Sequence, residues 1–350
     1  MRPADLFIAG LGTYLPEPAS AHEAVERGEY DADEHQRSGW TGAADAGELS
    51  APEMAVRAGR EALARSGHDP ADIDLVLHAG SYHQGPDGWS PAHYVQHHTV
   101  GGDAPAIEIR QTCNGMLVGV ELAACYLAAV PGRTAALLTG ADNFGTPLIS
   151  RWRYGSGLRS GRSSILGDAG TAVVVSRRAG FARLLAIDSA SIPELEELYR
   201  GDEPLFPPAA TIGAELRLGE RMARYAESRP GLLAWAHARL GEVRTDLAKR
   251  TLAEAGVAPG DITRATHVFA GTERHLQQVL EPIGIPAERG LLEFGRAHGH
   301  LGVNDHVAGL DHLVRTGQVR AGDHVLMVSN GAGTGLTCAV VQIVEDPKLT

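Results

Sequence analysis

The sequence predicts an α/β protein made of two similar halves that pack against each other. Residues 62–73 and 251–262 share one pattern, in which a helix end, a glycine and a Pro-x-Asp-Ile turn lead into an apolar strand. Residues 132–140 and 322–330 also resemble each other. The two pairs are separated by 189 and 190 positions. Two matches at nearly the same offset indicate an internal duplication.

Each half alternates helices with short apolar strands, for example at residues 75–80 and 267–271. Strands that are apolar along their whole length are typical of strands buried on both faces. Their alternation with helices predicts a mostly parallel sheet that is covered by helices. We expect residues 1–187 to form the first half and residues 241–350 to form the second.

Residues 188–240 match nothing in the first half. They hold a proline-rich piece at 205–208 and a helical pattern at 215–225. Two interpretations remain open for this insertion. It caps or lines a pocket, or it is a connecting helical hairpin that does not touch the substrate.

Cys113 lies within residues 106–125, at the point where an apolar strand gives way to a helix. The unpaired N–H groups and the positive end of a helix favour a thiolate at such a position. The alternative is a buried structural cysteine, which is the common fate of this residue type.

Composition excludes several classes of protein. Three cysteines in 350 residues, with no charged-then-apolar leader, predict a reduced cytoplasmic protein without disulfides. We expect no membrane span, because no apolar run approaches the roughly 20 residues needed. A net charge of −12 argues against broad nucleic-acid binding, which needs a basic face.

The duplication places a second cluster opposite Cys113. An offset of 190 leads from Cys113 to Val303, inside the segment 294–306, which also precedes a helix. Pairing of the two halves about a pseudo-twofold axis would bring these two helix starts together. Segment 294–306 is the richest cluster of titratable side chains in the chain.

A thiolate nucleophile needs a base, and the base needs a third group that fixes its tautomer. His300 and Asp305 can supply these roles, because a spacing of five suits a loop that enters a helix. His298 and His306 are competing candidates for the base. His298 lies earlier on the loop, and we expect the helix to turn the side chain of His306 away from the site. A metal site at His298, His300 and Asp305 is a further alternative. The chain has no Cys-x-x-Cys or His-Glu-x-x-His pattern, so we predict no metal.

Acyl transfer also needs N–H donors for the oxygen that becomes negative in the tetrahedral intermediate. The loop at residues 330–337 follows a strand, and we expect the N–H groups of Gly333, Thr334 and Gly335 to act with that of Cys113. The alternative is that these glycines only turn the chain. The loop does not fit the Gly-x-Gly-x-x-Gly pattern of a nucleotide site.

These residues resemble the thiolase-fold condensing enzymes, most closely the ketoacyl-acyl carrier protein synthase III type. Segments with family landmarks include 39–42, 165–172, 331–337 and the Cys113 segment. The resemblance implies a duplicated five-layered α-β-α-β-α fold, a homodimer and an acyl-thioester intermediate on Cys113. It also implies acyl donors on coenzyme A or an acyl carrier protein, and no permanently bound cofactor. Docking of an acidic carrier on the arginines at 151, 153, 159 and 162 is one reading, and solvated surface is the other.

One departure from the family pattern bears on the reaction. Condensing synthases carry a His-Gln-x-Asn loop after the first strand of the second half, where this chain has Gly271–Arg274. His275 is four residues late, and His300 lies near the position of the second loop's asparagine. The altered pattern resembles a subgroup with a Cys-His-Asp set that acts as acyltransferases in polyketide and antibiotic pathways.

The sequence therefore predicts a homodimeric acyltransferase with Cys113, His300 and Asp305 as its catalytic set. It would move an acyl group from a coenzyme A or carrier thioester to a hydroxyl or amine, or to a second carrier, without decarboxylation. One alternative is a starter-unit ketosynthase that performs decarboxylative Claisen condensation with the same residues. Another, of a different class, is a catalytically silent partner subunit.

Overall fold

The computed structural model describes residues 1–350 except 4, 156–163, 208–212, 333 and 346–350. Its strands are β1 (Phe7–Tyr14), β2 (Pro18–Ser20), β3 (Gly42–Ala44), β4 (Ile73–Ala79), β5 (Ala106–Ile109), β6 (Ala135–Asp142), β7 (Ala169–Ser176), β8 (Ala182–Ser191), β9 (Ile262–His267), β10 (His324–Asn330) and β11 (Gly335–Ile343). The α-helices are α1 (Ala21–Glu26), α2 (Ala32–Ser38), α3 (Ala51–Ser66), α4 (Pro91–His98), α5 (Gly115–Ala129), α6 (Glu196–Arg200), α7 (Leu218–Glu227), α8 (Leu232–Ala255), α9 (Glu273–Leu280), α10 (Leu292–His298) and α11 (Asp305–Arg315). Short 3₁₀ turns are η1 (Pro70–Asp72), η2 (Thr112–Asn114), η3 (Pro193–Leu195), η4 (Pro259–Asp261), η5 (Glu281–Ile283), η6 (Ala287–Arg289) and η7 (Gly302–Asn304).

The sheet topology confirms the duplication. The large sheet has the order β5-β4-β6-β7-β1-β8-β11-β10-β9. In the first half β4 and β6 are parallel, and β7 runs antiparallel to both β6 and β1. In the second half β9 and β10 are parallel, and β11 runs antiparallel to both β10 and β8. The series β4-β6-β7-β1 thus repeats as β9-β10-β11-β8, with a proline-led turn before β4 and before β9.

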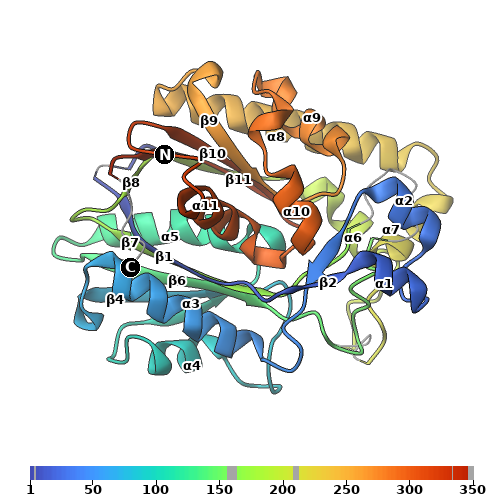
Figure 1. The fold of residues 1–350 in the computed structure, drawn as a ribbon, viewed down its shortest axis with the longest axis horizontal. Coiled ribbons are helices and arrows are strands. Elements are labelled where there is room, and N and C mark those ends of the chain that lie inside the picture. Colours follow the sequence, from blue (N-terminus) through green and yellow to red (C-terminus); the bar gives the residue numbers. More distant parts are fainter. Residues whose placement is uncertain (4, 156–163, 208–212, 333, 346–350) are drawn as a thin grey trace.

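The helices form layers around this sheet, as in the predicted thiolase-like fold (Figure 1). Helices α5 and α11 lie in the middle, between the two halves of the sheet. Helices α3 and α4 cover the outer face of the first half, and α8 and α9 cover that of the second. The two middle helices belong to different halves, so their N-termini meet at the centre of the molecule.

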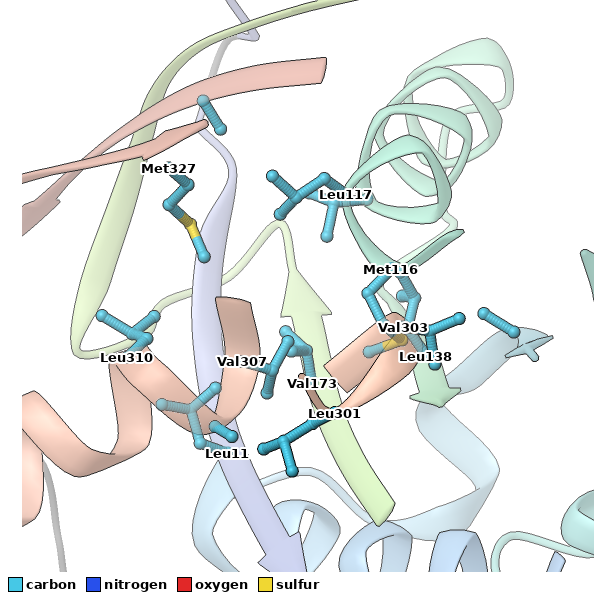
Figure 2. Close-up of a cluster of buried hydrophobic side chains, with 14 of the residues drawn as sticks. Leu11, Met116, Leu117, Leu138, Val173, Leu301, Val303, Val307, Leu310 and Met327 are labelled. Atoms are coloured by element: carbon cyan, nitrogen blue, oxygen red, sulfur yellow. The ribbon is translucent and has the colours of Figure 1, made fainter. Parts of the chain in front are cut away.

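The central core is a cluster of apolar side chains that joins the two halves. Figure 2 shows Met116 and Leu117 of α5 facing Val303 and Val307 of the η7–α11 segment. Val303 is fully buried, and its methyl groups lie against the backbone of Gly115 and Gly140. This packing removes apolar surface from water and fixes the start of α11 against the start of α5.

Helix α3 shows how the sequence sets an element. Ser50 and Glu53 form a capping box at its start, and Gly67 ends it in the left-handed conformation. The helix then packs directly on β1, because a Cβ atom at Gly12 would lie 2.0 Å from the carbonyl oxygen of Ala58. Glycine at this position permits the close approach of helix and strand.

The stretch Thr112–Ala129 passes a length and composition test for a membrane-crossing helix, with a mean hydropathy of 1.3. Half of it is buried inside the protein, and buried core helices pass the same test. This apolar stretch is longer than the sequence analysis expected. The position of α5 between the two halves of the large sheet accounts for its apolar composition. The predicted limits at 187/188 and 240/241 fall inside β8 and α8, and the three-part division stays a prediction.

Candidate active site

Cys113 is the central residue of η2, directly after β5 and before α5. The preceding Thr112 has a φ of 46°, which is a strained backbone conformation for threonine. Its hydroxyl donates to the carbonyl of Ala332 over 3.0 Å, and Ser329 donates to the carbonyl of Cys113 over 3.2 Å. The loop after β10 thus holds the turn that presents the thiol.

The structure brings the three residues of the predicted set together. The sulfur of Cys113 lies 2.9 Å from Nε2 of His300, and Nδ1 of His300 lies 2.6 Å from Oδ2 of Asp305. Oδ1 of Asp305 accepts the N–H of Leu301 over 2.7 Å, and Oδ2 accepts that of Phe269 over 2.9 Å. These bonds fix the carboxylate and therefore the ring of His300.

The charges around His300 favour its protonated form. Burial lowers the pKa of an imidazole, but the charges of Asp305 and Cys113 and the hydrogen bonds to them outweigh it. The pKa of His300 is therefore raised well above its usual value. An imidazolium at 2.9 Å from a cysteine sulfur favours the nucleophilic thiolate.

The competing histidines have other partners. Nδ1 of His298 lies 2.8 Å from the carbonyl of Phe294. His306 lies 3.1 Å from the hydroxyl of Thr266, and burial lowers its pKa to about 3, so it stays neutral. Within the described part of the chain, no cluster of three or more His, Cys, Asp or Glu residues is placed to hold a metal ion.

The predicted oxyanion donors divide into three cases. Gly333 lies outside the described residues. The N–H of Thr334 already donates to the carbonyl of Gly331 over 3.0 Å, so this amide is not directed at Cys113. Gly335 begins β11, where it pairs with Ser191. Ala332, which the sequence did not single out, lies beside Cys113 instead.

Two cavities meet at Cys113 and His300. The narrow cavity, of about 150 Å³, is lined by the segment 268–272, by His275 and by Asn330. The wide cavity, of about 380 Å³, is lined by residues of the first half such as Tyr82 and Phe144. Both cavities share Cys113, His300, Ala332, Tyr154, Tyr199 and Leu218. Residues of the segment 188–240 therefore line both cavities, as one of the two interpretations expected.

Asp142 is a site residue that no sequence pattern singled out. It is completely buried at the end of β6 and accepts the N–H of Ser81 over 2.8 Å, its hydroxyl over 2.7 Å and the N–H of Val303 over 3.0 Å. Burial raises the pKa of Asp142 to about 6. The carboxyl group ties the His300 loop to a wall of the wide cavity.

The proposed arginine patch needs a correction. Arg151 is buried, and its guanidinium pairs with Asp168 at 2.9 Å and Asp45 at 3.1 Å, so it holds the fold and offers no docking surface. Arg153 is exposed, while the arginines at 159 and 162 lie outside the described residues.

Comparison with known proteins agrees with this fold. Residues 252–343 match the family described as 3-oxoacyl-(acyl-carrier-protein) synthase III C terminal. The chain is 45% identical to ChlB3, a solved acyltransferase, with a TM-score of 0.89 and coverage of 98% of this chain and 99% of that one. It is 26% identical to the β-ketoacyl-(acyl-carrier-protein) synthase III of Synechocystis sp., over 83% of this chain and 82% of the relative.

A further solved structure supports the fold. The 3-oxoacyl-(acyl-carrier-protein) synthase III of Aquifex aeolicus has a TM-score of 0.77 and 21% identity, over 96% of this chain and 99% of that one. The duplicated sheet, the layered helices and the near-complete match to ChlB3 lead to one assignment. The chain belongs to the ketoacyl-acyl carrier protein synthase III family, a family of transferases with the thiolase fold.

Proposed function

We propose that this protein is an acyltransferase of secondary metabolism. It takes an acyl group from a coenzyme A or acyl carrier protein thioester onto Cys113 and passes it to a hydroxyl, an amine or a second carrier. The observation that carries the proposal is the continuous line from Cys113 through His300 to Asp305, with contacts of 2.9 and 2.6 Å. The similarity to ChlB3, which is described as an acyltransferase, supports it.

In the loading step the thiolate of Cys113 attacks the carbonyl carbon of the donor thioester. The bond between that carbon and the donor sulfur breaks, and the departing thiolate takes the proton from Nε2 of His300. Asp305 accepts the hydrogen bond from Nδ1 of His300 and holds the ring in place. The N–H of Cys113 is the proposed donor to the developing oxyanion.

In the transfer step His300 acts as a base. Its Nε2 takes the proton of the acceptor hydroxyl or amine, whose oxygen or nitrogen attacks the acyl carbon. The bond from the acyl carbon to the sulfur of Cys113 then breaks. The thiolate and the imidazolium are restored, so one base serves both steps and no cofactor is consumed.

The two cavities suit the two ends of a thioester. The narrow cavity is lined by glycines and by residues with polar side chains such as Thr272 and Asn330, which suits the amides of a pantetheine arm. The wide cavity is richer in apolar side chains, which suits an acyl group. We assign the narrow cavity to the thiol arm and the wide cavity to the acyl group.

Decarboxylative condensation is the second candidate, and the position of His275 favours it. His275 lies in the first turn of α9 and lines the narrow cavity together with Cys113 and His300. A second histidine in this cavity could stabilise an enolate. Incubation with an acyl thioester and malonyl-carrier protein separates the two functions. Release of carbon dioxide with a ketoacyl product would favour condensation over transfer.

Intact-mass measurement after incubation with acyl-pantetheine thioesters tests the proposed loading step. The wild-type protein should gain one acyl group, and Cys113→Ala should gain none. Cys125→Ala is the matched control, because Cys125 is an exposed thiol on α5 that lines neither cavity. An adduct that persists in Cys113→Ala would overturn the proposal. Complete failure of the wild type to acylate would instead support a silent partner subunit.

A further inference from the structure

We propose that the wide cavity selects acyl groups that carry a second, acidic group, and that Arg221 binds this group. The inference rests on the proposed acyl transfer, because it identifies what the same cavity holds. It assigns to the α6–α7 segment the choice of substrate. Neither the catalytic residues nor the family resemblance requires such a group.

The wide cavity combines apolar walls with one excess positive charge. Its apolar walls come from both sides of the site and are formed by Tyr82, Phe144, Ile149, Leu166, Leu216 and Leu218. Its charged residues are Glu196, Arg200 and Arg221. An unsubstituted alkyl chain would have no use for these charges, whereas an acidic substituent would balance the excess.

The two arginines of the cavity differ in their partners. Arg200 is satisfied, because its Nε lies 2.6 Å from Oε1 of Glu196 and its Nη1 faces the carbonyls of Gly201 and Glu203. The guanidinium of Arg221 makes no hydrogen bond or ion pair within the described part of the chain. The residues that the structure does not describe include one acidic side chain, that of Asp346. Arg221 is half-buried as a residue, and its guanidinium can form a charge-assisted pair with an anionic ligand in the cavity.

The fold directs Arg221 towards the cavity. Gly201 ends α6 with a φ of 66°, and a Cβ atom there would lie 2.9 Å from Cγ of Arg221. The aliphatic part of the arginine therefore packs on the backbone of Gly201. This contact between α6 and the first turn of α7 limits the rotamers open to the side chain.

Arg221 and Cys113 belong to the same electrostatic environment. Both residues line the wide cavity, and so does Tyr154. Burial and then the charge of Cys113 raise the pKa of Tyr154, and the charge of Arg221 opposes them. A molecule whose thioester carbon lies at Cys113 can thus reach Arg221 with its far end inside one cavity.

The chemistry of guanidinium favours a carboxylate as the ligand. Arginine binds a carboxylate through two parallel N–H donors, and such charge-assisted pairs are stronger than neutral hydrogen bonds. An acyl group derived from a dicarboxylic acid fulfils these conditions. Loss of one charge-assisted contact should lower the preference for the acidic acyl group by about 10-fold or more.

Paired pantetheine thioesters test the inference, because pantetheine is the part shared by coenzyme A and carrier donors. Succinyl is compared with butyryl, glutaryl with valeryl and adipyl with hexanoyl, and the rate of adduct formation on Cys113 is measured by intact mass. The wild type should favour the acidic member of at least one pair. Arg221→Gln should lose that preference while still loading the apolar member, and Arg221→Lys should keep part of it.

Arg224→Gln is the matched control. Arg224 lies one turn further along α7, is exposed and lines neither cavity. It should behave as the wild type. An equal preference in the wild type and Arg221→Gln, or faster loading of the apolar member in every pair, would overturn the inference.

Failure of the proposed function would look different. If no thioester loads on Cys113, the acyl transfer is contradicted, and Arg221 is then tested by titration calorimetry on Cys113→Ser. Tighter binding of glutaryl- than valeryl-pantetheine, lost in the added Arg221→Gln change, would uphold the assignment of Arg221. Equal binding of the two compounds would overturn it.

Discussion

Asp305 controls both the position and the charge of His300. Its Oδ2 lies 2.6 Å from Nδ1 of His300, and two backbone N–H groups hold the carboxylate in place. A negative charge at this distance raises the pKa of the imidazole. A neutral amide would preserve the shape of the site and remove this effect.

Asp305→Asn should therefore lower the pKa of His300 and slow the acylation of Cys113 by about 100-fold or more. The upper limb of the pH–rate profile should move to lower pH, because the imidazolium loses its proton earlier. Stopped-time intact-mass measurements over a pH series give this profile. Asp311→Asn is the control, since Asp311 is a second buried carboxylate on α11 that pairs with Arg315 away from Cys113. An unshifted profile in Asp305→Asn would contradict the role of Asp305.

Asp142 makes the stability of the fold depend on pH. Its pKa rises from 3.8 to about 6 on folding, because burial opposes the charged form. The folded state then binds the proton more tightly than the unfolded state. The resulting stability is fully present below about pH 4 and is lost as the pH rises through about 6.

Asp142→Asn should remove this dependence. Relative to the variant, the wild type should lose about 2 kcal/mol in its free energy of unfolding between pH 4 and pH 7. Urea denaturation of both proteins over that range provides the comparison. A difference between the two that stays constant with pH would show that Asp142 does not titrate in this way.

At the level of single residues, chemistry and repeat together led to three side chains that the structure brings into contact, while their catalytic roles stay a prediction. Cys113 was found from its place at a helix start, and the offset of the repeat led to the segment that contains His300 and Asp305. Asp142 and Arg221 could not be found in this way. The role of Asp142 depends on burial and on hydrogen bonds from Ser81 and Val303, which lie 61 and 161 positions away along the chain. The role of Arg221 depends on its place in a folded cavity, and neither role leaves a local pattern in the sequence.

The η7 turn is the element that connects the base to the rest of the site. It begins two residues after His300, and its first residue, Gly302, has a φ of 61°. A Cβ atom at Gly302 would lie 2.1 Å from Oδ2 of Asp142. The turn therefore depends on glycine for its backbone conformation and for its contact with a buried carboxylate.

Gly302→Ala should destabilise the protein by roughly 3 kcal/mol and reduce acyl loading more than unfolding alone explains. Gly317→Ala separates the two causes. Gly317 has a φ of 66°, but a Cβ atom there would meet nothing within 4 Å, so only about 1 kcal/mol of backbone strain is expected. Chemical denaturation and loading assays on both variants give the comparison. Equal losses would mean that the contact with Asp142 has no role.

At the level of elements, the strands and turns of the repeat could be predicted, but their limits could not. The glycine and Pro-x-Asp-Ile signals marked the turns before β4 and β9, because turn chemistry is local. The strand expected at residues 267–271 was wrong, because β9 starts directly after its turn and spans Ile262–His267. The expected limits of the insertion, at 187/188 and 240/241, lie inside β8 and α8. Both elements are continuous across these limits, so the sequence shows no break there. The second half also has no counterpart of β5 within the described residues.

At the level of the whole molecule, apolar side chains are exposed on the edge strand of the sheet and on the helix that follows it. β5 is the outermost strand of the sheet, and Ile107 on it is 50% exposed. Leu122, on the following helix α5, is also 50% exposed. An open strand edge with apolar neighbours is suited to pairing with another chain, which supports the proposed homodimer.

Ile107→Lys combined with Leu122→Lys should convert a dimer into a monomer, because charged side chains block edge pairing. Sedimentation velocity at several concentrations measures the change. Leu205→Lys is the control, since Leu205 is 80% exposed but lies outside both elements. A dimer that survives the double change, or one that is lost in the control, would place the interface elsewhere.

Cys113 and His300 reach their 2.9 Å contact from different copies of the repeat. The reacting distance is therefore fixed by the way one half sits on the other, through apolar residues such as Val303 that take no part in the chemistry. A displacement of about 1 Å between reacting groups can cost about 100-fold in rate. The catalytic rate should therefore respond to small changes in how the two halves pack. Core substitutions far from the substrate can then change turnover while the fold stays intact.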